Sequence, residues 1–301
     1  MNLVERACPG CGSTRTRGRA IEPRFDLAQL DEFAFSSRKV PEFMRFRMVE
    51  CDDCELLYAN PVPDGGFVEA AYHGSGFDSG EESHYAAHTY AEQLPRIVAE
   101  LPDRVGALDI GAGDGAFLAE LQRAGFEKVR GVEPSRAAVQ SAAPELRDSI
   151  REGFFSRGDA EPESLSLVSC FQTLEHVHEP AELFASARSL LKPGGALFTI
   201  AHDRTGLLSR VLGTRSPIFD IEHLQLFCPT SLRGLYERSG FERVRVAPLT
   251  NRYPLSYWIR LLPVPVALKR AATSLLTRVG LAKRTVPLRA GNLVAVGYRS
   301  R

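Results

Sequence analysis

The sequence predicts an α/β fold in which a doubly wound sheet of seven strands follows a small cysteine-containing module. Three observations support this prediction. An apolar run at 105–110 leads into a glycine-rich turn, strand and helix signals then alternate towards the end of the chain, and two Cys-x-x-Cys pairs precede the first strand. The 301 residues are 44% hydrophobic and 25% charged, which fits one large core and a smaller one and argues against a disordered chain.

The elements of the sheet follow one another in alternating order. We expect strands at 105–110, 129–133, 148–152, 165–171, 196–201, 242–248 and 292–298, and helices at 114–124, 135–143, 180–191 and 229–239. Pro180 suits the first turn of its helix, and Gly194 with Gly195 suits the turn after it. The segment 251–290 separates the last two strands.

The turn after the first strand has the spacing D-x-G-x-G-x-G, formed by Asp109, Gly111, Gly113 and Gly115. Glycines at alternate positions suit a backbone with unusual dihedral angles that comes close to a ligand. A dinucleotide site would have G-x-G-x-x-G and a helix N-terminus that faces a pyrophosphate. The acids Asp109 and Asp114 disfavour phosphate here and favour a cationic ligand. A tight turn without a ligand is the structural alternative.

This turn resembles the first motif of class I S-adenosylmethionine (SAM) methyltransferases. The resemblance implies a Rossmann-like methyltransferase sheet, with the glycines beneath the amino-acid part of SAM. Glu133 ends the second strand 18 residues after Gly115, where an acid accepts both ribose hydroxyls in that family; a helix-capping acid is the alternative. We expect the loop with Phe154 to wall one face of the adenine, with Asp159 as an alternative contact for its amino group.

The segment from Gln172 to Pro180, after the fourth strand, resembles the L-E-H-V-x-x-P segment of small-molecule methyltransferases, including ubiquinone-type O-methyltransferases. In related catechol enzymes an E-x-x-E-H run accompanies a divalent metal. Gln172 replaces the first acid of that run, which disfavours a catalytic metal. His176 is then a candidate general base, because an imidazole can lose its proton near neutral pH.

Two further histidines belong to the same edge of the predicted sheet. His202 ends the fifth strand, and Glu222 precedes His223 in a segment that resembles the E-H-x-x-x-F segment of SAM-dependent sugar C-methyltransferases. That resemblance implies that Glu222 and His223 face the acceptor. We expect His223 or His176 to remove the acceptor's proton, with Glu222 supporting the imidazole. Taken singly, each histidine is also compatible with a structural role.

The paired cysteines predict a metal site. Cys8, Cys11, Cys51 and Cys54 form two C-x2-C knuckles, which suit one structural Zn²⁺ in a closed tetrahedral site. Such a metal supplies folding free energy to a segment that is too small for its own core. Two disulfides or a redox pair are the alternatives. Cys170 and Cys228 lie in apolar runs, and we expect them to be buried thiols.

We therefore divide the chain into a zinc ribbon at 1–62, an aromatic linker or lid at 63–100 and a SAM-binding domain at 101–301. The linker region is rich in Tyr, Phe and His, including Tyr72, His73 and Phe77 around Gly74, and predicts a helix at 85–101. This helix could lie across the mouth of the sheet as a lid or pack on the core as a connector. The SAM-binding domain contains a basic insertion at 251–290.

The charges are unevenly distributed. Residues 251–301 contain ten Lys or Arg and no acid, so residues 1–250 carry a net charge of −10, because the whole chain has 37 charges of each sign. The apolar stripe of the insertion fits a cover for the acceptor pocket, a second subunit, a membrane surface or the parent domain. An anionic acceptor would also account for the basic residues. We expect no DNA partner and disfavour RNA, because the rest of the chain is acidic.

The leading hypothesis is a SAM-dependent methyltransferase that methylates oxygen, nitrogen or carbon of a small molecule of the sugar, quinone or natural-product type. The alternatives are an RNA or protein methyltransferase and a non-catalytic SAM-binding scaffold. The N-terminus has no apolar stretch of signal-peptide length, and we expect a cytoplasmic protein.

Overall fold

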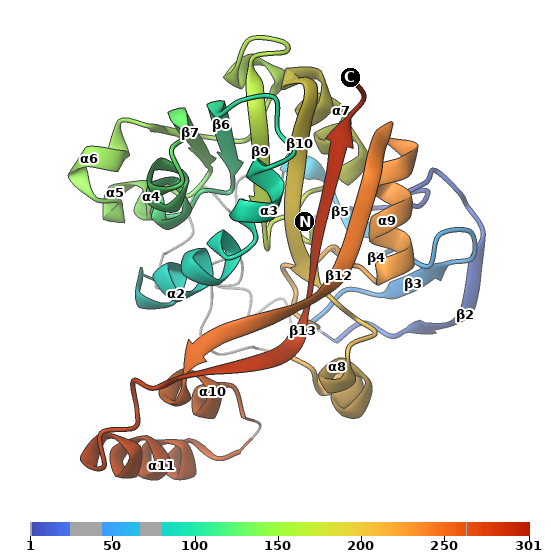
Figure 1. The fold of residues 1–301 in the computed structure, drawn as a ribbon. Coiled ribbons are helices and arrows are strands. Elements are labelled where there is room, and N and C mark those ends of the chain that lie inside the picture. The colour runs from blue at the N-terminus through green and yellow to red at the C-terminus, as the bar shows by residue number, and fades with distance from the viewer. Residues whose placement is uncertain (1, 25–43, 67–79, 263) are drawn as a thin grey trace.

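Seven strands form the central sheet. The computed structural model describes residues 2–24, 44–66, 80–262 and 264–301, and the sheet has the order β12-β13-β10-β9-β6-β7-β8 (Figure 1). The bounds are β6 Val105–Ile110, β7 Glu127–Glu133, β8 Ile150–Glu152, β9 Leu165–Phe171, β10 Leu191–His202, β12 Phe241–Pro254 and β13 Thr285–Arg299. Strands β8, β7, β6, β9 and β10 are parallel, and β13 is antiparallel to β10 and β12. The predicted doubly wound sheet is confirmed.

Helices cover both faces of this sheet. They are α2 Gly80–Ala91, α3 Leu94–Val98, α4 Ala116–Arg123, α5 Arg136–Ser141, α6 Pro144–Arg147, α7 Pro180–Leu190, α8 Leu207–Leu212, α9 Pro229–Arg238, α10 Leu255–Leu261 and α11 Val266–Arg278. Successive strand residues point to opposite faces. Leu108 therefore joins the core beneath α7 and α9, while Ala107 joins the core beneath α2, α3 and α4. Cys170 and Cys228 are buried free thiols, as predicted.

The paired cysteines lie at a second, smaller sheet, where Cys51 ends a strand and the other three lie in loops and turns. Its order is β11-β4-β3-β2, formed by β2 Thr16–Ile21, β3 Met48–Cys51, β4 Leu57–Ala59 and β11 Gln225–Leu226. A short pair, β1 Leu3–Val4 with β5 Val62–Pro63, lies beside it. Strand β11 comes from the chain after the fifth strand of the large sheet. The small sheet is thus built from two distant parts of the sequence. We call its N-terminal part, residues 2–24 and 44–63, the cysteine module.

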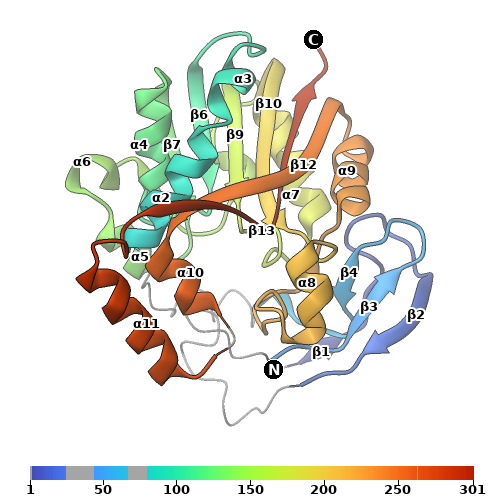
Figure 2. The same ribbon diagram turned by 60° about the horizontal axis from the view of Figure 1, so that its bottom comes forward.

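The last two strands extend past the sheet as a two-stranded arm. Pairing of β12 with β13 continues from Asn251 opposite Leu288 to Pro254 opposite Thr285. The expected interruption at 251–290 is therefore narrowed to residues 255–284, which carry α10 and α11 at the tip (Figures 1 and 2). We call residues 251–290 the basic arm.

The segment before the large sheet differs from its prediction. The helix expected at 85–101 is two helices, α2 and α3, because Pro95 in the first turn of α3 cannot continue an α-helix from the preceding turn. The expectations for Tyr72, His73, Gly74 and Phe77 lie outside the described residues. No described helix has the length and apolar composition needed to cross a membrane.

Candidate active site

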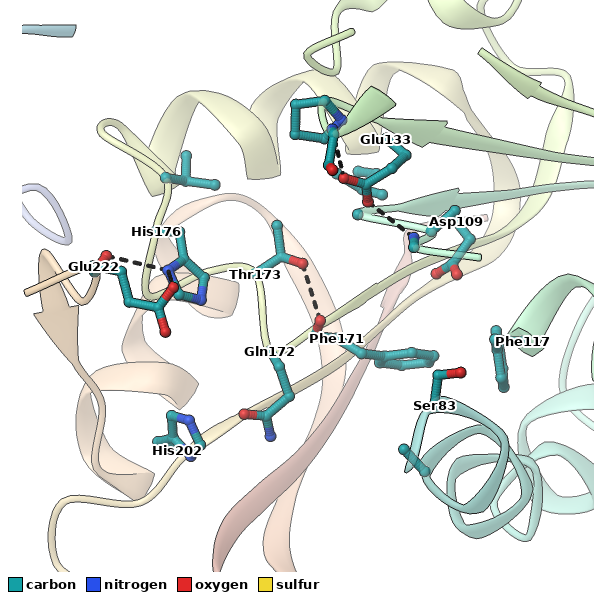
Figure 3. Close-up of a pocket in the computed structure, with 18 of the residues that line it drawn as sticks. Ser83, Asp109, Phe117, Glu133, Phe171, Gln172, Thr173, His176, His202 and Glu222 are labelled. Atoms are coloured by element: carbon teal, nitrogen blue, oxygen red, sulfur yellow. Dashed lines mark hydrogen bonds and ion pairs between the residues drawn. The ribbon is translucent and has the colours of Figure 1, made fainter. Parts of the chain in front are cut away.

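A cavity of about 830 Å³ lies at the carboxyl ends of the parallel strands. This volume lies within the range of ~300–1,000 Å³ typical of small-molecule sites. The walls come from the glycine turn, the loops after β7, β8, β9 and β10, and helices α2 and α10. Asp109 and Glu133 lie on one side, and His176, His202 and Glu222 lie on the other (Figure 3). The cavity therefore has two halves.

The glycine turn brings the backbone of one half to the cavity surface. Gly111, Gly113 and Gly115 have φ angles of 76°, 56° and 78°, the left-handed region that glycine enters without a steric penalty. A Cβ atom on Gly111 would lie 2.3 Å from Oγ1 of Thr173. A side chain at this position would displace the loop after β9, so glycine is required for both its dihedral angles and its size.

Glu133 is held at the end of β7 by two backbone amides. Oε2 accepts a hydrogen bond from the Gly113 amide at 2.9 Å, and Oε1 accepts one from the Ser135 amide at 2.8 Å. Burial raises the pKa of Glu133, and these two amides oppose the shift by stabilising the carboxylate. Each carboxylate oxygen has a second lone pair, so the group can still accept two hydroxyl donors.

Two further acids line the same half. Asp109 is 3% exposed, and its Oδ1 accepts a hydrogen bond from the Ser169 hydroxyl at 2.6 Å. Burial raises the pKa of Asp109 to about 7. Asp114 accepts hydrogen bonds from the Ser83 hydroxyl at 2.7 Å and from the Ala116 amide at 3.2 Å. With Glu133, these side chains make this half suitable for a ligand with positive charge and hydroxyl groups.

The two residues expected near an adenine have different surroundings. Phe154 lines the cavity and is 41% exposed, so a flat ligand could cover its ring. Asp159 is not among the described residues that line the cavity. Its carboxylate instead accepts a hydrogen bond from the Ser156 amide at 2.7 Å and pairs with Arg151. The geometry thus favours Phe154 over Asp159 as a ligand contact.

Three histidines meet in the other half, as the topology of the sheet predicted. The ring centroids of His176 and His223 are 4.8 Å apart, and those of His202 and His223 are 5.1 Å apart. Nδ1 of His223 lies 2.7 Å from the Ile218 carbonyl oxygen. A carbonyl can only accept, so Nδ1 of neutral His223 carries the proton and Nε2 keeps its lone pair.

The same reasoning applies to the neighbouring imidazoles. Nδ1 of His176 lies 3.1 Å from the Glu222 carbonyl oxygen and therefore donates to it. Nδ1 of His202 lies 3.1 Å from Oδ1 of Asn292. Burial lowers the pKa of all three imidazoles, in the case of His202 to about 4. The cluster is therefore neutral near pH 7.

The carboxylate of Glu222 lies near two of these rings. Its Oε1 is 4.0 Å from Nε2 of His223, and its Oε2 is 3.9 Å from Nδ1 of His176. Ligand atoms of these three residues lie within 4.8 Å of one another, so they could also hold a metal ion. A metal bound as in the E-x-x-E-H pattern would instead use residues 172, 175 and 176. Residue 172 is a glutamine, and the carboxylate of Glu175 already accepts a hydrogen bond from the His202 backbone amide, so this second metal site is disfavoured.

An aromatic wall completes the acceptor half, and most of it comes from the basic arm. Tyr253 and Tyr257 stack with ring centroids 4.3 Å apart, and Trp258 meets Tyr253 edge to face at 5.4 Å. All three line the cavity, together with Tyr90 from α2. A cover for the acceptor pocket was one of the roles that the sequence left open for this basic insertion, but the sequence did not single out these three rings. Asn292, which orients His202, had no recognisable sequence signal.

The four paired cysteines converge as predicted. Sγ of Cys8 lies 3.5 Å from Sγ of Cys54, Sγ of Cys11 lies 3.5 Å from Sγ of Cys51, and all four sulfurs are within 4.8 Å of one another. A tetrahedral Zn²⁺ with Zn–S bonds of about 2.3 Å requires S–S separations of about 3.8 Å. A disulfide requires about 2.05 Å. The four thiols therefore fit a structural zinc ion better than two disulfides.

Comparison with known proteins identifies the class. Residues 83–246 match a family model described as a methyltransferase domain, and the chain belongs to this family of SAM-dependent methyltransferases. It is 29% identical to the ubiquinone biosynthesis O-methyltransferase of Ralstonia nicotianae over 171 residues, covering 50% of this chain and 70% of that protein. For the Serratia proteamaculans enzyme of the same name, the identity is 32% over 166 residues, with coverages of 49% and 68%.

Solved structures agree on the fold. The YcgJ protein of Bacillus subtilis superposes with a TM-score of 0.51 and 12% identity, over 71% of this chain and 99% of that protein. The protein is therefore an enzyme with the class I methyltransferase fold, its cofactor is SAM, and a small-molecule acceptor fits its family.

Proposed function

We propose that this enzyme transfers the methyl group of SAM to a hydroxyl group of an uncharged aromatic small molecule, such as a phenol. The observation that supports this most directly is the single cavity that joins the glycine turn and Glu133 to an aromatic wall and three buried imidazoles. Phenolic oxygen becomes a good nucleophile when it loses its proton, so a neutral base next to an aromatic wall suits this acceptor. The similarity to ubiquinone biosynthesis O-methyltransferases supports the same acceptor class.

The cofactor half would hold SAM, which supplies a methyl group on a sulfonium centre. Glu133 would accept the two ribose hydroxyls with the lone pairs that its backbone donors leave free. Gly111, Gly113 and Gly115 would allow the backbone to approach the amino-acid part, and Asp109 would offset its positive charge. Phe154 would cover one face of the adenine.

In the acceptor half, Nε2 of His223 would take the proton from the acceptor hydroxyl. The carboxylate of Glu222, 4.0 Å from that nitrogen, would stabilise the imidazolium that forms. His176 would orient Glu222 by donating to its carbonyl oxygen. Alignment of the acceptor oxygen with the methyl carbon contributes most of the acceleration, since well-oriented reactions gain about 7–11 kcal/mol.

The charges of the cavity favour an uncharged acceptor over an anionic one. The single Arg or Lys among the described lining residues is Arg260, and it already pairs with Glu82. Eight lining residues carry carboxyl groups, namely Glu82, Asp109, Asp114, Glu133, Glu179, Glu182, Asp220 and Glu222. An anion would be repelled by these groups unless they were protonated.

The decisive experiment combines cofactor binding with a product assay. Calorimetry should detect binding of SAM and of its demethylated product. Glu133→Ala should weaken the affinity for both ligands by ~10-fold or more, because the ribose contacts are lost. Incubation with SAM and a panel of catechols, phenols, amines and sugars should give O-methylated phenols by mass spectrometry, with turnover retained in EDTA. Binding without any O-methylated product would overturn the acceptor proposal. Loss of turnover in EDTA, with the zinc content of the cysteine site and the Tm unchanged, would favour a metal held by His176, Glu222 and His223.

We also propose that the outer face of the basic arm contacts an anionic membrane surface. No described residue of α11 is buried, and Leu268, Leu275 and Val279 are 59%, 61% and 57% exposed. Their spacing of seven and four residues places them on one side of the helix. Helix α8 exposes Leu207 and Val211 at 79% and 73%, and both helices lie at the same end of the molecule (Figures 1 and 2).

The charge of these helices suits such a surface. Residues 204–219 and 251–291 contain no acid. Eight of their basic side chains form no ion pair with an acid in the described parts of the chain: Arg210, Arg215, Lys269, Arg270, Arg278, Lys283, Arg284 and Arg289. Basic residues near an anionic membrane contribute about 1 kcal/mol each. A bilayer that dissolves apolar phenols would present them beside the aromatic wall.

A further inference from the structure

The segment that carries Glu222 and His223 continues directly into the cysteine module. Strand β11 pairs antiparallel with β4, with Gln225 opposite Tyr58 and Leu226 opposite Leu57. The Ala59 amide also donates to the Leu224 carbonyl at 2.8 Å. The residue after His223 is therefore already bonded to the module, and the position of the imidazole depends on where the module lies.

Arg6, two residues before the first cysteine, adds a second connection. Its Nη1 donates to the His178 carbonyl at 2.8 Å, and its Nη2 donates to the Leu224 carbonyl at 3.1 Å and to Oε1 of Gln225 at 3.2 Å. Its Nε donates to the Ala59 carbonyl at 3.2 Å. One guanidinium thus joins the loop after His176, the strand after His223 and the module. Its planar arrangement of five N–H donors makes this possible.

These two loops are also bonded to each other. The Leu224 amide donates to the Glu175 carbonyl at 2.8 Å, and Nε2 of Gln225 donates to the Val177 carbonyl at 2.7 Å. Arg6 contacts this pair from the side of the module, where its backbone amide is bonded to Oδ1 of Asn60 at 3.0 Å. Within the described parts of the chain, none of the hydrogen bonds of Arg6 reaches the glycine turn or β7 of the cofactor half.

We infer that Arg6 is a positioning residue for the acceptor half: it holds the loops of His176 and of Glu222–His223 at a fixed separation by bonding both to the cysteine module. The catalytic role of these histidines rests on the proposed function, whereas the positioning itself does not. Arg6 would touch neither SAM nor the acceptor. Its loss should change the geometry of proton removal and leave the cofactor half intact.

The test compares Arg6→Ala and Arg6→Lys with Arg15→Ala. Arg15 is a matched control in the same module, because its side chain is 69% exposed and pairs with Asp53 rather than with the catalytic loops. Arg6→Ala should lower kcat by ~10–100-fold, since misplacement of about 1 Å can cost 10²-fold, while the Kd for SAM stays within about twofold. Lysine has a single nitrogen that cannot reach all three segments, so Arg6→Lys should restore little activity.

A second measurement needs no acceptor. Hydrogen exchange followed by mass spectrometry should show faster exchange in Arg6→Ala at 174–178 and 222–226, with no change at 105–116, and added guanidinium ion should slow it again. Unchanged exchange in those loops would overturn the inference, as would an equal loss of SAM affinity and of kcat. If the wild-type enzyme methylates no phenol, the proposed function fails, while the exchange data still decide the role of Arg6.

Discussion

The cysteine module and the basic arm are both additions to the same sheet, but they are attached in different ways. The module shares β11 with the chain of the large sheet, and Cys8, Cys51 and Cys54 belong to the same core as Leu232 and Tyr236 of α9. The arm is an extension of two strands, and its α11 has no buried residue among those described. The module shares a core with the catalytic domain and can therefore fix the positions of catalytic loops. The arm has an exposed outer face and can therefore bind another surface.

Breaking the metal site should have the largest effect. Cys51→Ser removes one of four thiolates, and structural zinc supplies about 10–16 kcal/mol of apparent binding free energy in zinc-finger peptides. We expect the Tm to fall by ~10 °C or more and turnover to be lost, because β3 and β4 anchor β11. Differential scanning calorimetry measures the Tm, and a zinc assay measures the bound metal. Asp53→Ala, in the same knuckle, should change neither the Tm nor the zinc content. A Cys51→Ser protein with wild-type Tm would show that the module is stable without the metal.

Loss of the proposed base should affect chemistry while leaving SAM binding intact. His223→Gln keeps an N–H donor for the Ile218 carbonyl but has no basic nitrogen, so kcat should fall by ~10²–10⁴-fold. The Kd for SAM, measured by calorimetry, should stay within about twofold. His88→Ala, at an exposed position on α2, is the control. Wild-type kcat in His223→Gln would exclude His223 as the base and leave His176.

Stability should depend on pH through the same histidines. Burial lowers the pKa of His176, His202 and His223 in the folded protein, and an unfolded histidine has a pKa of about 6.5. The unfolded chain therefore binds more protons below pH 6.5, so stability is fully present above that pH and decreases as the pH falls further. Each additional proton contributes about 1.4 kcal/mol per pH unit.

Thermal unfolding between pH 8 and pH 5 tests this dependence. His202→Asn removes the imidazole whose pKa is lowered to about 4, so it should reduce the slope of Tm against pH below 6.5. An equally steep slope in this variant would show that His202 is not held neutral in the folded state. His88→Ala again serves as the comparison, because its side chain is 72% exposed.

Changing the outer face of the arm should have the smallest effect on the enzyme itself. In Leu268→Gln with Leu275→Gln, both side chains are exposed, so Tm and kcat on a water-soluble phenol should be unchanged. Sedimentation with vesicles that contain anionic phosphatidylglycerol should fall several-fold, because apolar contact and charge act together. Wild-type protein should not bind neutral phosphatidylcholine vesicles. Equal sedimentation of the variant and the wild type would overturn the proposed membrane contact. A dimer that only the wild type forms would show that this face binds a second copy of the chain instead.

The sequence predicted the sheet and both halves of the site because those signals are local. Apolar runs bounded by Gly or Pro define the strands, and His176 and His202 follow the ends of neighbouring parallel strands, so the topology brings them together. The four cysteines needed only their spacing. None of these inferences required knowledge of long-range packing.

The parts that were missed depend on contacts between distant residues. Strand β11 has two residues, Gln225 and Leu226, which are too few for any periodicity. The extension of β12 ends at Pro254, which argues against a strand, but β12 is the edge of the sheet and tolerates residues without an N–H donor. Arg6 has no sequence signal at all, because its partners lie 53 to 219 residues away.

The pairing of β11 with β4 also limits how this enzyme can be re-engineered. Leu226 is completely buried and packs with Met48 and Leu57 of the module. Removing residues 1–63 would leave this leucine and an unpaired strand edge in water, a combination that favours aggregation. The module therefore cannot be deleted or exchanged as an independent cassette, and a grafted replacement would need to carry an edge that matches Gln225 and Leu226.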